Sequence, residues 1–131
     1  MSWVEVYAVL VVSHLVGDFI LQTDSQARWK EGGLGPDPVR RRALRNHVAT
    51  YTAAFLPALI WIAGETSVAK AVLIAIVVAA PHWIQDDGRL LNAWMVVVKG
   101  TDPAENPGLR VAVDQSFHLV FLFAAALLAA A

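Results

Sequence analysis

Residues 3–21 read WVEVYAVLVVSHLVGDFIL, an apolar run that is interrupted only by Glu5, Ser13, His14, Gly17 and Asp18. The run is about as long as the ~20 residues that an α-helix needs to cross the hydrocarbon layer of a bilayer. A secretory signal would carry basic residues before its apolar core, and residues 1–4 contain none. The stretch therefore predicts a membrane-spanning helix that is retained in the protein.

The composition of the chain favours the same class of protein. Of the 131 residues, 57% are apolar and 16% are charged, whereas soluble domains have about 45–50% and about 25%. A chain this short has little interior, so the apolar surplus must face lipid or partner chains. The absence of cysteine excludes disulfides, thiolate metal sites and thiol nucleophiles. The formal net charge of −1 gives no electrostatic case for nucleic-acid binding.

Three further apolar stretches predict three more spans, at residues 43–63, 67–87 and 109–131. We expect Pro57 to be tolerated within the second span and Pro81 to kink the third. Because long parts of these spans have no polar stripe, a soluble helical bundle is disfavoured. The prediction is a single all-α membrane domain over residues 1–131, an integral membrane four-helix bundle that lies in the lipid bilayer.

Two polar loops join the spans, at residues 22–42 and 88–108. A short surface helix is expected within the first loop, over residues 25–31. In the second loop, apolar residues recur at helical spacing between Leu90 and Val97, which predicts a short interfacial helix after the third span. Nine of the ten Lys and Arg residues lie at residues 28–45 and 89–110. The positive-inside rule therefore predicts that both loops are cytoplasmic and that both termini are outside.

Seven histidine and aspartate side chains, with Asp87 at the end of the third span set aside, lie inside the predicted spans, near the ends that meet these loops. A charged residue within a membrane helix costs at least ~2.5–3.5 kcal/mol on insertion scales, so such residues are functional candidates. Six of the seven form pairs at i, i+4, which places both members on one helix face. The pairs are His14 with Asp18, His82 with Asp86, and Asp114 with His118, and the seventh residue is His47.

The depth of these residues supports a shared site more strongly than their spacing does. Where a span runs toward the cytoplasm the histidine precedes the aspartate, and in the fourth span, which runs away from it, the order is inverted. Each aspartate is therefore nearer the cytoplasm than its histidine, and the seven residues form a layer within ~12 Å of that surface. His47 lies at the level of the aspartates. Gln22, Gln85 and Gln115 flank the aspartates and are candidates to hydrogen-bond them.

Imidazole and carboxylate ligands without sulfur suit zinc, manganese or non-haem iron. The seven candidate metal ligands are His14, Asp18, His47, His82, Asp86, Asp114 and His118. Seven ligands exceed the need of one tetrahedral ion, which leaves two alternatives: a two-metal centre, or one ion with carboxylates that orient its histidines. The simpler alternative is that the pairs are hydrogen-bonded clamps that fix helix packing.

The motifs His14-x-x-Gly17-Asp18-Phe19-x-x-Gln22, then His82-x-x-x-Asp86, then Asp114-Gln115-x-x-His118 resemble a family of small bacterial inner-membrane proteins that is carried as a domain of unknown function. The resemblance covers essentially the whole chain. It implies a four-helix protein of the bacterial inner membrane and supplies no reaction. Arg89 stands where the family pattern has a lysine, which keeps the positive charge without a deprotonatable amine.

The function that these residues favour is metal-dependent hydrolysis of a lipid-linked or membrane-near substrate. Asp18, Asp86 and Asp114 are the catalytic candidates, because an aspartate that does not bind the metal can act as the general base. One alternative is a proton- or cation-coupled transport component, in a homo-oligomer. Another is a non-catalytic membrane subunit that anchors a cytoplasmic protein partner. Bis-histidine haem is disfavoured by the aspartates beside three of the four histidines.

Overall fold

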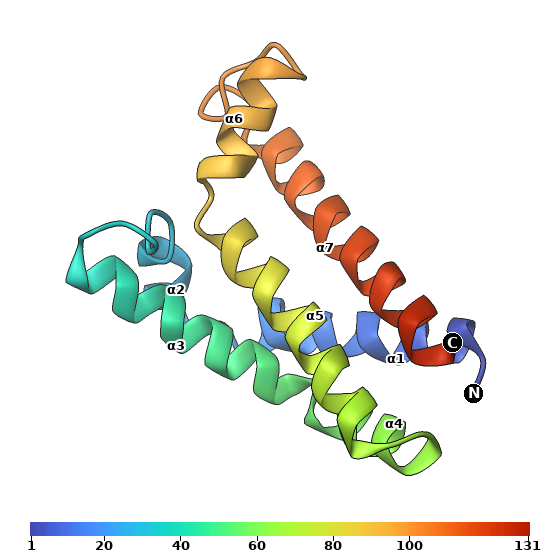
Figure 1. The fold of residues 1–131 in the computed structure, drawn as a ribbon. Helices are drawn as coiled ribbons and strands as arrows, with labels where there is room; N and C mark the ends of the chain where they lie inside the picture. The colour runs from blue at the N-terminus through green and yellow to red at the C-terminus, as the bar shows by residue number, and fades with distance from the viewer.

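The computed structural model describes residues 1–131 as an all-α protein without strands (Figure 1). Three helical stretches are long and apolar enough to cross a membrane, and a bent helix pair makes a fourth if it is counted as one span. The elements are α1 (Trp3–Leu15), η1 (Val16–Ile20), α2 (Asp24–Trp29), α3 (Pro38–Ala54), α4 (Leu56–Glu65), α5 (Val68–Asp86), α6 (Arg89–Val97) and α7 (Pro107–Ala130).

The first predicted span is formed by α1 and the π-helix η1 together. Ser2 caps α1, because its hydroxyl accepts from the backbone N–H of Val4 (3.2 Å) while the Glu5 carboxylate accepts from the N–H of Ser2 (2.9 Å). At the other end the helix widens, and the N–H of Leu21 donates to the carbonyl of Val16 five residues earlier (2.9 Å). Single π-turns of this kind are often found at functional sites.

The second predicted span is broken, which corrects the expectation of one helix over residues 43–63. The break falls between α3 and α4, whose axes differ by 46°. Pro57 explains it, because proline has no N–H to donate and its ring clashes with the carbonyl four residues earlier. The helix also begins sooner than predicted, at Pro38, where the Asp37 carboxylate caps it by accepting from the N–H groups of Val39 (2.8 Å) and Arg40 (3.3 Å).

The remaining predicted helices are confirmed with small shifts at their ends. Residues 67–87 contain α5, which continues through Pro81, and residues 109–131 correspond to α7. The short helix expected between Leu90 and Val97 is α6, and that expected over residues 25–31 is α2. Gly88 joins α5 to α6 with φ of +77°, a left-handed conformation that glycine adopts without strain.

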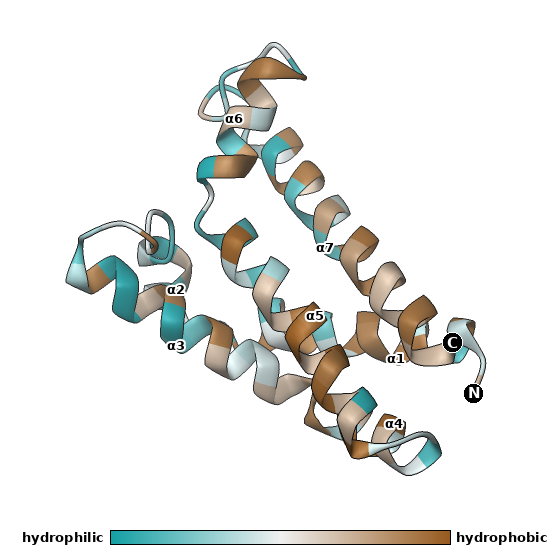
Figure 2. Cartoon of the chain, in the orientation of Figure 1, coloured by the Kyte–Doolittle hydropathy of each residue, from teal (hydrophilic) through white to brown (hydrophobic).

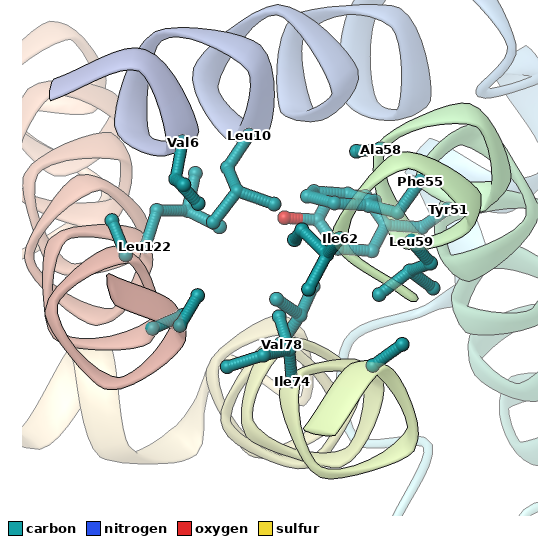
Figure 3. Close-up of a cluster of buried hydrophobic side chains, with 14 residues drawn as sticks. Val6, Leu10, Tyr51, Phe55, Ala58, Leu59, Ile62, Ile74, Val78 and Leu122 are labelled. Atoms are coloured by element: carbon teal, nitrogen blue, oxygen red, sulfur yellow. The ribbon is translucent and has the colours of Figure 1, made fainter. Parts of the chain in front are cut away.

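Apolar side chains fill the part of the molecule near the two termini (Figures 1 and 3). There α1 packs on α7, and α5 packs on both α4 and α7. The only polar side-chain atom among these residues is the Tyr51 hydroxyl. The cluster consists of Val6, Leu10, Tyr51, Phe55, Ala58, Leu59, Ile62, Ala71, Ile74, Val78, Leu122, Ala125, Ala126 and Ala129.

The outer surface of the helices is apolar as well. Only 22–33% of the residues in the three spanning windows are buried, and side chains such as Ile60 and Val68 are more than 70% exposed. Figure 2 shows most of the hydrophilic residues around α2, the start of α3, the α6 region and the start of α7, with a smaller group at the turn between α4 and α5. An apolar exterior of this extent is the mark of a membrane protein.

Candidate metal centre

The seven titratable residues lie beyond the apolar cluster, toward the end of the molecule that carries α2 and α6. All four histidine side chains are buried, with no more than 2% of their surface exposed. Asp18 and Asp86 are buried too, and Asp114 is half-buried. Solvation by bulk water therefore does not account for these polar groups, and their partners must be protein atoms or a bound ion.

Four of the residues bring one ligand atom each to a common point. They are Asp18, His47, His82 and Asp86, and their ligand atoms all lie within 4.8 Å of one another. His47 Nε2 lies 3.1 Å from His82 Nε2, 3.2 Å from Asp18 Oδ1 and 2.8 Å from Asp86 Oδ2. His82 Nε2 lies 3.6 Å from Asp18 Oδ1 and 3.1 Å from Asp86 Oδ2. We call these four residues the metal group.

The spacing of the metal group fits four-coordinate binding of one ion. Ligands placed ~2.0–2.1 Å from zinc at the corners of a tetrahedron are ~3.3 Å apart. Five of the six edges of the metal group measure between 2.8 and 3.6 Å. Asp18 Oδ1 is buried and accepts no hydrogen bond, as expected of an oxygen that is available to an ion.

The π-turn and a glycine position Asp18 in the metal group. Gly17 precedes it in η1 and packs against Tyr51, where a Cβ on Gly17 would lie only 2.7 Å from Tyr51 Cδ2. The absence of a side chain at Gly17 thus lets η1 approach α3 closely. The Tyr51 ring in turn stacks on the His82 imidazole, with ring centroids 3.4 Å apart and planes 4° apart. Tyr51 therefore links the apolar cluster to the metal group.

A second set of possible ligands shares Asp86 with the first and consists of Asp86, Asp114 and His118. His118 Nε2 lies 3.5 Å from Asp86 Oδ1 and 3.7 Å from Asp114 Oδ2. The other nitrogen, His118 Nδ1, lies 3.3 Å from His82 Nδ1. The two histidines of this contact are therefore coupled through one hydrogen bond.

The position of the protons decides which of these two sets can hold an ion. If His82 Nε2 offers its lone pair to an ion, its proton is on Nδ1 and is donated to His118 Nδ1. A neutral His118 then carries its own proton on Nε2, directed toward the carboxylates of Asp86 and Asp114. In this arrangement His118 orients His82 and does not itself bind a metal. The hydrogen bond thus allows only one of the two sets to offer a histidine lone pair to an ion at a time, and the convergence of four ligand atoms, against three, favours the metal group.

His14 belongs to neither set, although the sequence predicts it as a ligand. Its Nε2–H donates to Gln115 Oε1 (2.9 Å), and its Nδ1 accepts from the Tyr51 hydroxyl (3.1 Å). Nδ1 also lies 3.5 Å from Asp18 Oδ2. Both ring nitrogens thus have protein partners, which suits a residue that holds Tyr51 in position.

Lys30 is a further member of the site that the sequence does not reveal. It follows α2, and its Nζ donates to Asp86 Oδ2 (2.9 Å) and to Gln22 Oε1 (2.7 Å), and lies 3.5 Å from His47 Nε2. No periodicity or pairing distinguishes Lys30 from the other basic residues of its loop. The short helix expected over residues 25–31, which includes Lys30, is the only sequence feature that bears on its position.

The loop that carries Lys30 is fastened to the end of α5 through Asp87. The Asp87 carboxylate accepts from the N–H of Leu34 (2.7 Å), and its backbone carbonyl accepts from the N–H of Gly32 (2.8 Å). Burial alone would raise the pKa of the Asp87 carboxyl, but hydrogen bonds from Arg89 and Leu34 outweigh it and lower the pKa below its ordinary value. An ion pair between Arg110 and Glu31 ties the same loop to α7.

Comparison with known proteins supports the family and leaves the reaction open. Searches among curated proteins and among solved structures gave no match. The family described as "Protein of unknown function (DUF3307)" matches residues 6–131, which confirms the resemblance to a domain-of-unknown-function family. The chain, which carries a buried His/Asp group in an apolar helical frame, therefore belongs to the DUF3307 family.

Proposed function

We propose that this DUF3307 protein is an integral membrane protein that binds one divalent metal ion through Asp18, His47, His82 and Asp86. The observation that carries the proposal is the convergence of four buried ligand atoms at the edge lengths of a tetrahedron. Two imidazole nitrogens and two carboxylate oxygens without sulfur suit zinc, with manganese and iron as the other candidates.

Charge balance supports an ion at this position. Two buried carboxylates bring a charge of about −2 into a poorly solvated region, and of the nearby residues only Lys30 is always cationic. A divalent cation would neutralise Asp18 and Asp86 completely.

The bent pair α3 and α4 serves as the fourth span in this proposal, because it meets the length and composition criteria when it is counted as one.

The proposed membrane is the bacterial inner membrane, with the metal group at its cytoplasmic end and both termini outside. Nine of the ten Lys and Arg residues lie in the two polar regions at that end of the helices, and the positive-inside rule assigns this side to the cytoplasm. The tryptophan side chains of Trp3 and Trp83, each about 40% exposed, are available to the two membrane interfaces.

The reaction class that we propose is metal-dependent hydrolysis of a substrate near the membrane surface. Four protein ligands fill a tetrahedral shell, so catalysis needs a further coordination position. Lys30 contacts Asp86 Oδ2 from the side of the first loop. Movement of the Lys30 side chain away from Asp86 would open this side of the metal group to water or substrate. Asp114 lies outside the metal group and is half-buried, so it is the candidate general base. Transport gains no such support, since apolar side chains fill the other half of the molecule.

Metal analysis of the purified protein tests the proposal. Wild-type protein reconstituted in nanodiscs, loaded with zinc and dialysed, should retain about one equivalent, and the double variant His47→Ala/His82→Ala almost none. Asn46→Ala, an exposed neighbour of His47, is the matched control and should retain the metal. His14→Ala should retain it too, because His14 lies outside the metal group. Folded wild-type protein that holds no stoichiometric zinc, manganese or iron after reloading would overturn the proposal.

A further inference from the structure

A pocket opens where the loop before α3 meets the start of α3 and the end of α5. Its volume is about 640 Å³, within the ~300–1,000 Å³ of most sites for small molecules. No carboxylate lines it, and the metal group takes no part in its walls. The lining residues are Gly33, Leu34, Pro38, Val39, Arg41, Arg42, Arg45 and Trp83.

The three arginines of this pocket have no acidic partners. Five of the ten Lys and Arg residues form ion pairs with carboxylates, and three of the other five are these arginines. Arg41 donates to the Pro36 carbonyl (3.1 Å), and the exposed side chains of Arg42 and Arg45 form no hydrogen bond within the protein. The pocket therefore presents uncompensated positive charge to an anion, and guanidinium groups suit a phosphate because they donate two parallel hydrogen bonds.

The other walls of the pocket are apolar and well fixed. Leu34, Val39 and Trp83 line it with 49%, 56% and 40% of their surface exposed. The loop is held tightly against α3, because a Cβ on Gly33 would lie only 2.5 Å from Leu44 Cβ. A tryptophan beside positive charge is typical of a membrane interface, where one part of a ligand is polar and the other apolar.

An exposed apolar surface continues from the pocket along both helices. Successive turns of α3 beyond Arg45 and of α5 before Trp83 present small or apolar side chains at i, i+3 and i+4 spacing, and the two helices pack against each other (Figure 1). A soluble phosphate ester would leave this surface unused, whereas the acyl chains of a lipid would cover it. The exposed residues on these faces are Ala49, Ala53, Ile76 and Ala80.

We propose that this pocket binds the headgroup of an anionic phospholipid. The phosphate accepts hydrogen bonds from Arg42 and Arg45, the glycerol lies against Leu34 and Trp83, and the acyl chains follow α3 and α5. Basic pockets between membrane helices on the cytoplasmic side are suited to anionic headgroups. The bound lipid fastens the loop before α3 to the membrane, and its binding is independent of the proposed metal centre.

Native mass spectrometry of protein released from nanodiscs tests the proposal. The nanodiscs contain equal amounts of phosphatidylglycerol and phosphatidylcholine with identical acyl chains. We expect one phosphatidylglycerol to be retained per protein, at least about tenfold in preference to phosphatidylcholine, because each basic residue near an anionic headgroup contributes about fivefold. Retention of both lipids in proportion to their abundance would mean ordinary boundary lipid and would overturn the proposal.

Variants separate the pocket from the overall charge of the protein. Arg42→Gln/Arg45→Gln should lower the preference by about tenfold or more. The matched control is Lys70→Gln/Lys99→Gln, which removes the two other positive charges that lack ion pairs and should behave like the wild type. Equal losses in both would refute the pocket. Val39→Glu keeps all three arginines and adds a carboxylate to the pocket, so it should also lose the preference, and a wild-type preference in this variant would refute the site.

Two further arms identify the source of the phosphate and isolate the metal. Millimolar glycerol 3-phosphate should not displace the retained phosphatidylglycerol, because it has no acyl chains, and displacement would assign the pocket to a soluble phosphate ester. The variant His47→Ala/His82→Ala should retain the lipid, since the metal group does not line the pocket. Retained lipid without metal would sustain the pocket and remove the metal centre, and stoichiometric metal without lipid preference would do the reverse.

Discussion

Near the termini the helices meet through apolar side chains alone, whereas toward α2 and α6 the same long helices meet through histidine and aspartate. The apolar half gains its stability from packing and does not depend on any one atom. The polar half depends on a few ligand and hydrogen-bond distances between 2.7 and 3.7 Å. A membrane protein of this size can thus keep an apolar frame and a buried His/Asp cluster in one set of helices, separated along their length.

The largest expected effect is a loss of stability without a loss of metal binding, when a residue of the apolar half is truncated. Ile74 is fully buried in the apolar cluster, and Ile74→Ala should lower the free energy of unfolding by about 2–5 kcal/mol. Unfolding by SDS in mixed micelles measures the loss, and metal bound per folded molecule should stay at about one. Ile76→Ala, on the same helix but 57% exposed, is the control and should change stability by about 0.5 kcal/mol or less. Equal losses in both variants would contradict the assignment of the α5 faces.

The next effect is a loss of metal binding while the apolar half stays folded, when a residue of the metal group is substituted. Asp86 contacts His47, His82 and Lys30, and Asp86→Asn should weaken zinc binding by more than about 100-fold, because even residues that only orient ligands cost 10–100-fold. A competing chelator titration measures the affinity. Glu105→Gln, in the exposed loop before α7, should leave the affinity unchanged. If Asp86→Asn binds zinc like the wild type, Asp86 is not a ligand.

A third substitution couples the two halves, because it acts on Tyr51. In Gly17→Ala the new methyl group meets the Tyr51 ring, which should cost about 1–3 kcal/mol of stability and also lower zinc affinity by moving the ring that stacks on His82. Unfolding and zinc titrations are measured on the same preparation. Gly64→Ala has open space around it and should change neither quantity for the worse. Loss of stability with unchanged affinity would show that Tyr51 does not position His82.

A fourth substitution concerns the lysine that reaches the metal group from the loop. The Lys30 ammonium group and a divalent cation would compete for Asp86 Oδ2 and repel each other. Lys30→Met should therefore raise zinc affinity by up to about tenfold. Lys99→Met, an exposed lysine of the second loop, is the control for the loss of one positive charge. The same chelator titration applies, and a fall in affinity for Lys30→Met would mean that Lys30 holds the ligands in place.

The smallest effect tests how the loop is fastened and depends on pH. The pKa of Asp87 is lowered in the folded protein, so its stabilising contribution is present above the ordinary pKa of an aspartate, about 4, and is lost as the pH falls through the lowered value. Asp87→Asn should therefore cost about 1 kcal/mol at pH 7 and progressively less below pH ~4. Unfolding titrations across this range measure it. A difference between wild type and variant that is constant with pH would remove Asp87 from this role.

Much of this architecture follows from the sequence because its rules are local. Hydropathy finds α5 and α7, and the 3.6-residue period pairs His82 with Asp86 without knowledge of the fold. A proline in a membrane helix can either be tolerated or break the helix. Which of the two happens at Pro57 depends on the neighbouring helices, so the break after α3 was not predicted. Lys30 reaches the metal group from the first loop, whose sequence has no helical or strand periodicity that would place it there. The hydrogen bond that couples the tautomers of His82 and His118 can be recognised only when both rings are in place.

The order of the ligands along the chain has a consequence for how the protein is made. Asp18, His47, His82 and Asp86 all precede α6, so synthesis from the N-terminus completes the metal group before α7 emerges. The last helix then adds His118 against His82 and its apolar half against α1 and α5. An ion bound at this stage would hold the first three spans together until α7 is inserted, so metal binding would assist assembly of the helices.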